Sequence, residues 1–153
     1  MHFKFFYQNS RLLLFGIIMS FTSSFGQTFF ISLFGPSIQF EYGLSHTSWG
    51  TIYLIGTLLS AIILTYSGSL IDYYRLNFFT YFSVIALVFS CFFISIVSGY
   101  FFLIFAVFLL RQTGQGLTSH ISVTTMARYF SEKRGTAIAI GSLGMAIGEA
   151  ILP

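Results

Sequence analysis

The amino-acid sequence predicts an all-α fold, a polytopic bundle of about five transmembrane helices. Of the 153 residues, 56% are hydrophobic and only 7% are charged, whereas roughly a quarter of the residues in a soluble domain are charged. So few charges cannot cover a water-exposed surface. The apolar residues also form long runs without charge, and a helix of about 20 such residues crosses the hydrocarbon of a bilayer. We therefore expect an integral membrane protein surrounded by membrane lipid.

The first predicted span covers residues 12–34. Lys4 and Arg11 precede it, as in a secretory signal peptide, but the uncharged stretch Leu12–Phe40 is too long for one. We interpret this stretch as a retained first helix. We expect the helix to end at Gly35–Pro36, because adjacent glycine and proline residues usually mark a loop.

The remaining spans are separated by polar or turn-like segments. No charged residue occurs between Leu76 and Leu110, and one helix of that length would reach about 52 Å, far more than a bilayer. The run must therefore fold back, and Ser98-Gly99-Tyr100 is its most turn-like point. The sequence stops at Pro153 without a polar tail, which we interpret as truncation before a sixth helix. The five predicted spans are residues 12–34, 48–70, 77–97, 101–123 and 135–153.

The basic residues fall on one side of these spans. Lysine and arginine near the ends of transmembrane helices mark the cytoplasmic side of a membrane. The predicted loops at 35–47 and 98–100 contain neither residue. The N-terminus is therefore predicted to be cytoplasmic, and no basic patch remains for a nucleic-acid partner. The six basic residues on that side are Lys4, Arg11, Arg75, Arg128, Lys133 and Arg134.

Arg111 interrupts the fourth span near its middle. An arginine at that depth costs about 2.5 kcal/mol or more unless it faces protein, water or a charged partner. Glu149 in the fifth span lies at a similar predicted depth, about 21 to 23 Å from the basic side at 1.5 Å per residue. Two interpretations stay open. In the first, Arg111 and Glu149 form a buried ion pair that fixes helix register. In the second, which is functional, Arg111 faces a central cavity and binds an anionic substrate, or Glu149 takes up a proton that is linked to transport.

Polar residues continue along the fourth span after Arg111. Gln115 and His120 follow it at spacings typical of a polar stripe, so both are candidates to line a pathway, with a purely structural histidine as the alternative for His120. In the fifth span, Gly141, Gly144 and Gly148 are three and four residues apart. Small residues on one face let transmembrane helices approach closely, which predicts a packing seam.

Enzyme chemistry and metal binding find no support in the sequence. Cys91 is the single cysteine, so no internal disulfide and no cysteine cluster can form. Paired catalytic acids and histidine-rich ligand motifs are also absent. We therefore expect no metal, no cofactor and no enzymatic activity.

The loop after the second span carries a recognisable spacing. Gly68, Leu70 and Asp72 resemble the Gly-x-Leu-x-Asp motif between helices two and three of the major facilitator superfamily. That motif usually continues with several basic residues, whereas here Arg75 is the single one. Asp72 is expected to cap the third helix or to pair with Arg75. The resemblance implies that Gly68, Asp72 and Arg75 belong to a gating loop.

Two further segments resemble the same superfamily in the proper order. Arg111 with Gly114-Gln115-Gly116 is similar to its helix-four motif, and Gly144–Gly148 is similar to its helix-five glycine repeat. The Gln-Gly pair stands one residue later than usual, and Glu149 replaces a frequent proline. The resemblance covers essentially the whole chain.

The resemblance implies a secondary transporter of a small solute, built from about twelve helices in two halves that alternate access to a central site. Its further partners would then be a proton as coupling ion and a C-terminal half that this sequence lacks, so we expect the 153 residues alone to be inactive. The strings YGLSHTSWGTIY and RQTGQGLTSH are similar to bacterial organic-anion and monocarboxylate porters, which implies the bacterial inner membrane. The alternative is a small assembly or sensor subunit without transport activity.

Overall fold

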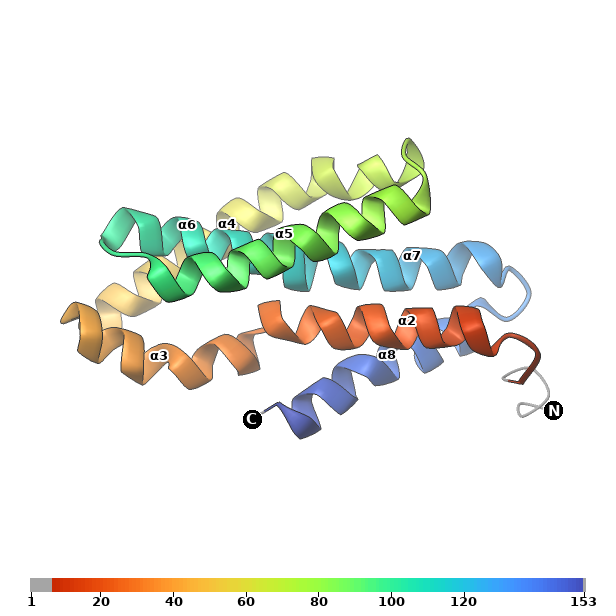
Figure 1. Cartoon of the computed structure of the whole chain (residues 1–153), viewed down its shortest axis with the longest axis horizontal. Coiled ribbons are helices and arrows are strands. Elements are labelled where there is room, and N and C mark those ends of the chain that lie inside the picture. The colour runs from red at the N-terminus through yellow and green to blue at the C-terminus, as the bar shows by residue number, and fades with distance from the viewer. Residues whose placement is uncertain (1–6, 153) are drawn as a thin grey trace.

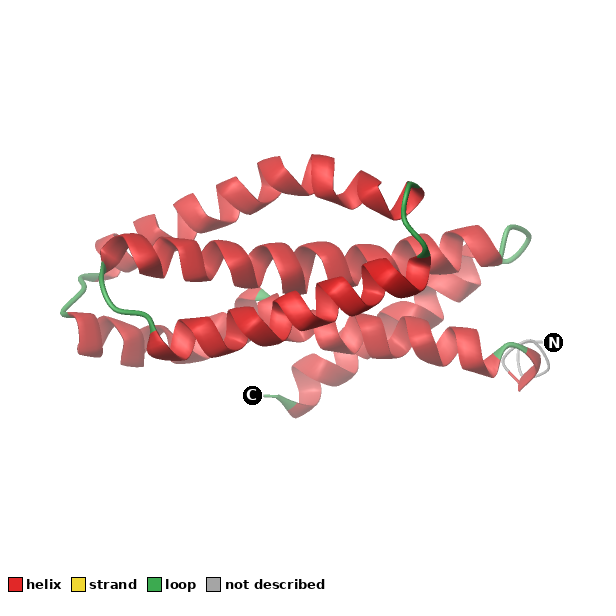
Figure 2. Ribbon diagram, turned by 45° about the horizontal axis from the view of Figure 1, so that its top comes forward, coloured by secondary structure: helices red, strands yellow, loops and turns green. Residues whose placement is uncertain are grey.

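The computed structural model describes residues 7–152, and these residues form a bundle of helices without strands. The helices run side by side along the long axis of the molecule and are joined by short turns (Figures 1 and 2). The all-α fold is therefore confirmed. In chain order the elements are α2 (Ser10–Ser23), η1 (Ser24–Gly26), α3 (Thr28–Tyr42), α4 (His46–Ser67), η2 (Gly68–Asp72), α5 (Leu76–Ile96), α6 (Tyr100–Leu110), η3 (Arg111–Thr118), α7 (Ser119–Tyr129) and α8 (Arg134–Ile151).

Four helical stretches in the described part of the chain are long and apolar enough to cross a membrane. Several of them consist of more than one element, as where α6, η3 and α7 form one stretch. The predicted fifth span corresponds to α8, whose 18 residues include Arg134 and Glu149 and which is not among the four. Residue 153 lies outside the described residues. The four stretches are Ser10–Tyr42, His46–Asp72, Leu76–Ile96 and Tyr100–Tyr129.

The predicted end of the first helix at Gly35–Pro36 is wrong. Pro36 lies inside α3, which continues to Tyr42 and ends at Gly43 in the left-handed conformation (φ 61°). Proline removes one backbone hydrogen bond, a loss that membrane helices tolerate. The break in this span comes earlier, at Gln27, whose backbone is extended (φ −79°, ψ 154°).

The chain turns place the basic residues at one end of the bundle. The start of α2, the turn between α4 and α5 and the loop between α7 and α8 all lie at the same end, while the other two turns lie at the opposite end (Figure 1). We call the first of these the basic end, because its segments carry Arg11, Arg75 and the cluster Arg128–Arg134. Lys4 lies outside the described residues. The assignment of this end to the cytoplasm stays a prediction.

Gly141, Gly144 and Gly148 of α8 are buried where this helix packs against α2 and α7. A Cβ atom on Gly144 would lie 2.7 Å from the Phe21 amide nitrogen and would also collide with the Ile17 carbonyl. A Cβ atom on Gly148 would lie 2.8 Å from Ser24 Cβ, and one on Gly141 would lie 3.2 Å from Met126 Cγ. The backbones of α2 and α8 therefore approach so closely that only glycine fits at Gly144 without a shift.

Candidate functional site

Arg111 lies at the centre of a polar cluster in the middle of the bundle. Its side chain is buried, with 8% of the residue surface exposed. Its Nη1 donates hydrogen bonds to the Gly26 carbonyl at 3.2 Å and to Thr28 Oγ1 at 3.1 Å. The Tyr53 hydroxyl donates to the same Thr28 oxygen at 2.8 Å, and the Tyr53 ring centroid lies 5.5 Å from Arg111 Cζ, a cation–π distance.

Two unusual backbone segments create this cluster. Arg111 begins η3, a π-helical stretch of eight residues, and π-helical turns inside α-helices are frequent at functional sites. On the opposite side, Gly26 ends η1 just before the extended Gln27. A Cβ atom on Gly114 would lie 2.6 Å from Gly26 Cα, so the two glycines let the backbones touch. This contact brings the Gly26 carbonyl within reach of Arg111.

A pocket of about 260 Å³ lies between α4 and η3. Two residues that line this pocket each have a buried polar atom without a hydrogen-bond partner among residues 7–152, namely Arg111 Nε and Thr57 Oγ1. Leaving a buried donor unpaired costs about 1–3 kcal/mol, which makes such groups candidates to bind a ligand. We call this the inner pocket, and its lining residues are Thr57, Ser60, Ala61, Leu64, Arg111, Gln115 and Gly116.

A second pocket, of about 370 Å³, lies nearer the basic end and contains His120. His120 Nε2 lies 3.4 Å from Thr124 Oγ1, and a Cβ atom on Gly68 would lie 3.6 Å from the same nitrogen. His120 therefore does not share the pocket of Arg111 and Gln115. We call this the outer pocket, and its lining residues are Leu64, Thr65, Gly68, Ser69, Ile71, Asp72, His120, Thr124 and Arg128.

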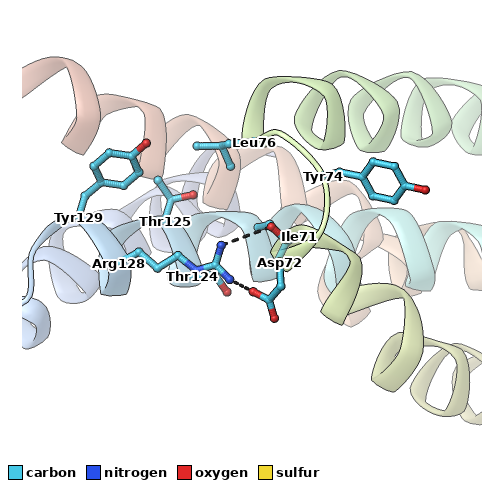
Figure 3. Close-up of a pocket in the computed structure, with 8 residues that line it drawn as sticks. All are labelled: Ile71, Asp72, Tyr74, Leu76, Thr124, Thr125, Arg128 and Tyr129. Atoms are coloured by element: carbon cyan, nitrogen blue, oxygen red, sulfur yellow. Dashed lines mark hydrogen bonds and ion pairs between the residues drawn. The ribbon is translucent and has the colours of Figure 1, made fainter.

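Asp72 joins η2 to α7 at the basic end. Its carboxylate pairs with Arg128 Nη2, while Arg128 Nη1 donates to the Ile71 carbonyl at 3.3 Å (Figure 3). Both side chains are about half exposed. The expected pairing of Asp72 with Arg75 is therefore wrong, as is its capping of α5, whose N-cap position is Arg75 without a side-chain bond. The turn directs Arg75 outward, and the partner comes from α7, which lies beside η2.

The family model of the major facilitator superfamily matches residues 2–153. The chain belongs to this superfamily. Neither a curated protein nor a solved structure matches it. Members of the superfamily are membrane transporters rather than enzymes, and together with the apolar helices the match makes this chain an integral membrane transporter protein.

The predicted ion pair between Arg111 and Glu149 does not form in this major facilitator chain. Among residues 7–152, no carboxylate oxygen lies within 4.0 Å of the Arg111 guanidinium. Glu149 is exposed on α8, and α8 packs against α2 and α7 rather than beside Arg111. The prediction used depth along the membrane normal, which does not say which helices are lateral neighbours.

Sequence reasoning also missed two residues of the major facilitator chain. Gln112 joins α4 to η3, since its Oε1 accepts from Ser60 Oγ at 3.1 Å and its Nε2 donates to Ser67 Oγ at 2.6 Å. Arg128, which the sequence predicts only as an orientation signal, binds the Asp72 carboxylate. Gln112 stands beside Arg111 inside an apolar span, and this position is the signal that could have identified it from the sequence.

Proposed function

We propose that this chain forms part of a secondary active transporter and that its inner pocket binds a small organic anion. The observation that carries the proposal is the pair of unpartnered buried donors, Arg111 Nε and Thr57 Oγ1, at one pocket. We place the protein in the plasma membrane of a bacterium, with the basic end in the cytoplasm.

The charge of Arg111 supports an anionic solute. Its Nη1 is held by a carbonyl and a hydroxyl oxygen, which fixes the guanidinium without neutralising it. A carboxylate is the partner that matches the planar edge of a guanidinium best, because it accepts two parallel hydrogen bonds. The Thr57 hydroxyl and the Gln115 amide would then donate to the remaining oxygens of the solute.

The dimensions of the inner pocket support a small solute. Its volume of about 260 Å³ is below the range of roughly 300–1,000 Å³ that holds drug-sized ligands. Leu64, Ala61 and the backbone of Gly116 form its apolar wall. A short organic acid with one carboxylate satisfies both the single cation and this wall. Alternating exposure of the pocket to the two sides of the membrane would complete the transport cycle.

The test is uptake by the full-length protein in proteoliposomes, with a panel of short carboxylates and their uncharged amide analogues. We expect Arg111→Gln to weaken apparent affinity for the transported carboxylate by about 30-fold or more, as expected for losing about 2 kcal/mol of a buried charged contact. Thr57→Val, which keeps the shape of the side chain, should weaken it less.

The matched control is Arg11→Gln, which removes an exposed arginine at the start of α2 and should leave uptake unchanged. Equal uptake by wild type and Arg111→Gln would contradict the proposal. Preference for the uncharged analogues by the wild type would contradict it as well, since the guanidinium would then not select the solute.

A further inference from the structure

The inner and outer pockets share one lining side chain. Leu64 of α4 lines both of them, so it stands between Arg111 in the inner pocket and His120 in the outer pocket. We call the two pockets together the groove. On the inner side of Leu64 the groove presents Thr57 and Ser60, and on the outer side it presents Thr65 and Ser69. An apolar side chain thus interrupts a row of hydroxyl groups.

The opposite wall of the groove leaves just enough room for this leucine. A Cβ atom on Gly116 would lie 3.0 Å from Leu64 Cδ1, so Leu64 rests against the bare backbone of η3. Leu64 also packs against the apolar cluster that contains Leu117 and Ile121. Its position is therefore defined by contacts, and it closes the gap between α4 and the fourth span.

The groove does not suit contact with lipid. Arginine, glutamine and histidine side chains at membrane depth face protein or water, because hydrocarbon cannot solvate them. The lipid-compatible face of α4 is the other one, where Leu58, Leu59 and Ile62 are exposed. Water and polar solutes can therefore occupy the groove on both sides of Leu64.

We propose that Leu64 is a hydrophobic gate on a route from the basic end of the bundle, through the outer pocket, to the inner pocket. This inference rests on the proposed transport function. When Leu64 lies against Gly116, the constriction is apolar, and water and ions leave such a constriction by dewetting. Rotation of the Leu64 side chain away from Gly116 opens the route and leaves the contacts of Arg111 with Gly26, Thr28 and Tyr53 in place.

Thiol accessibility tests the gate in the full-length protein without knowledge of the solute. In a background in which Cys91 and any other cysteine of the full-length protein are replaced by serine, Thr57→Cys reports on the inner pocket and Ser69→Cys on the outer pocket. A membrane-impermeant methanethiosulfonate reagent is added to membranes of either orientation. Ser69→Cys identifies the preparation in which the basic end faces the reagent, and the labelling rate of Thr57→Cys is measured in that preparation.

We expect Leu64→Ala to raise the labelling rate of Thr57→Cys about tenfold, which corresponds to about 1.4 kcal/mol in the opening equilibrium. Leu64→Phe should lower the rate, and Ser69→Cys should be labelled equally in all backgrounds. Leu59→Ala is the matched control, since it shortens a leucine on the lipid-facing side of α4, and it should leave every rate unchanged.

Equal labelling of Thr57→Cys in wild type, Leu64→Ala and Leu64→Phe would overturn the gate. Absence of labelling at Thr57→Cys in all three, with Ser69→Cys labelled, would overturn the route. Neither result touches the role of Arg111, because uptake by the Arg111 variants is a separate measurement. Conversely, wild-type uptake without preference for anions would reject the anionic solute. If the labelling rate of Thr57→Cys still depended on Leu64, the gate would stand.

Discussion

Arg111 is held in place by neutral groups. A carbonyl oxygen, a hydroxyl oxygen and an aromatic face surround the guanidinium, and each compensates part of the cost of taking the charge out of water. None of them cancels the charge itself. A guanidinium in this state would bind the anion that we propose with little reorganisation, which is the kind of preorganisation that a binding site needs.

The surroundings of Glu149 differ from those of Arg111. It is exposed on α8 beside Ile147 and Ile151, which are exposed as well. Glu149 is the one acidic residue of α8, and an ionisable residue among apolar side chains of a membrane protein is a candidate functional group. Glu149 is therefore our candidate to carry the coupling proton.

We expect Glu149→Gln to abolish the dependence of uptake on a proton gradient while leaving binding of the anion intact. Wild-type uptake should rise as the pH on the entry side falls, and the variant should respond little. The measurement is the initial uptake rate in proteoliposomes with imposed pH gradients. Glu132→Gln, in the loop before α8, is the control. An unchanged pH response in Glu149→Gln would remove Glu149 from the coupling step.

Among the contacts between helices, the one between α2 and α8 is the most extensive. Glycine is required at Gly144 because the α2 backbone at Ile17 and Phe21 occupies the space of a side chain. Close backbone contact increases dispersion between helices, which matters most where lipid removes the hydrophobic driving force.

Gly144→Ala should destabilise the protein by about 1–3 kcal/mol, the usual cost of an added methyl group in a filled contact. The matched control is Gly50→Ala in α4, where a Cβ atom meets nothing within 4 Å, and where alanine should favour the helix by up to about 1 kcal/mol. Thermal unfolding in detergent measures both. Equal melting temperatures for the two variants would contradict the packing role of Gly144.

The sequence predicts helical elements well because charge-free runs and the requirements of a bilayer leave few alternatives. It failed at Pro36, since a helix in lipid can continue through proline where neighbouring groups compensate. It also missed η3, because a π-helical stretch has no composition of its own. The stretch contains Gly114, which touches Gly26, and these two glycines are far apart in the sequence.

For the whole molecule, the placement of positive charge at one end is the main constraint on insertion. The turns at the opposite end, around Gly43 and Gly99, contain no basic residue. Charge does not determine which helices lie side by side. The helix α8 packs beside α2 because its glycines let the two backbones approach closely. The order of the helices and the gathering of basic residues at one end were therefore predictable from the sequence, whereas the neighbours of each helix, and with them the inner pocket, were not.

The orientation can be measured with alkaline phosphatase fusions in bacteria. This enzyme depends on disulfides and is active only outside the reducing cytoplasm. We expect a fusion after Ser45 to be active and a fusion after Glu132 to be inactive, because the basic end stays in the cytoplasm. Both fusions should be produced in equal amounts. The reverse pattern of activity would contradict the predicted orientation.

The π-helical stretch changes the direction in which side chains of the fourth span point on either side of it. Arg111 and His120 are nine residues apart, and at 3.6 residues per turn they would point to opposite sides after about two and a half turns. Hydrogen bonds from i to i+5 place more residues in each turn of η3, so the rotation between the two is smaller. Both side chains therefore line pockets against α4 and η2. A helical wheel of constant period places His120 opposite Arg111, so the expected polar stripe of Arg111, Gln115 and His120 is wrong for an ideal α-helix and depends on the π-helical stretch.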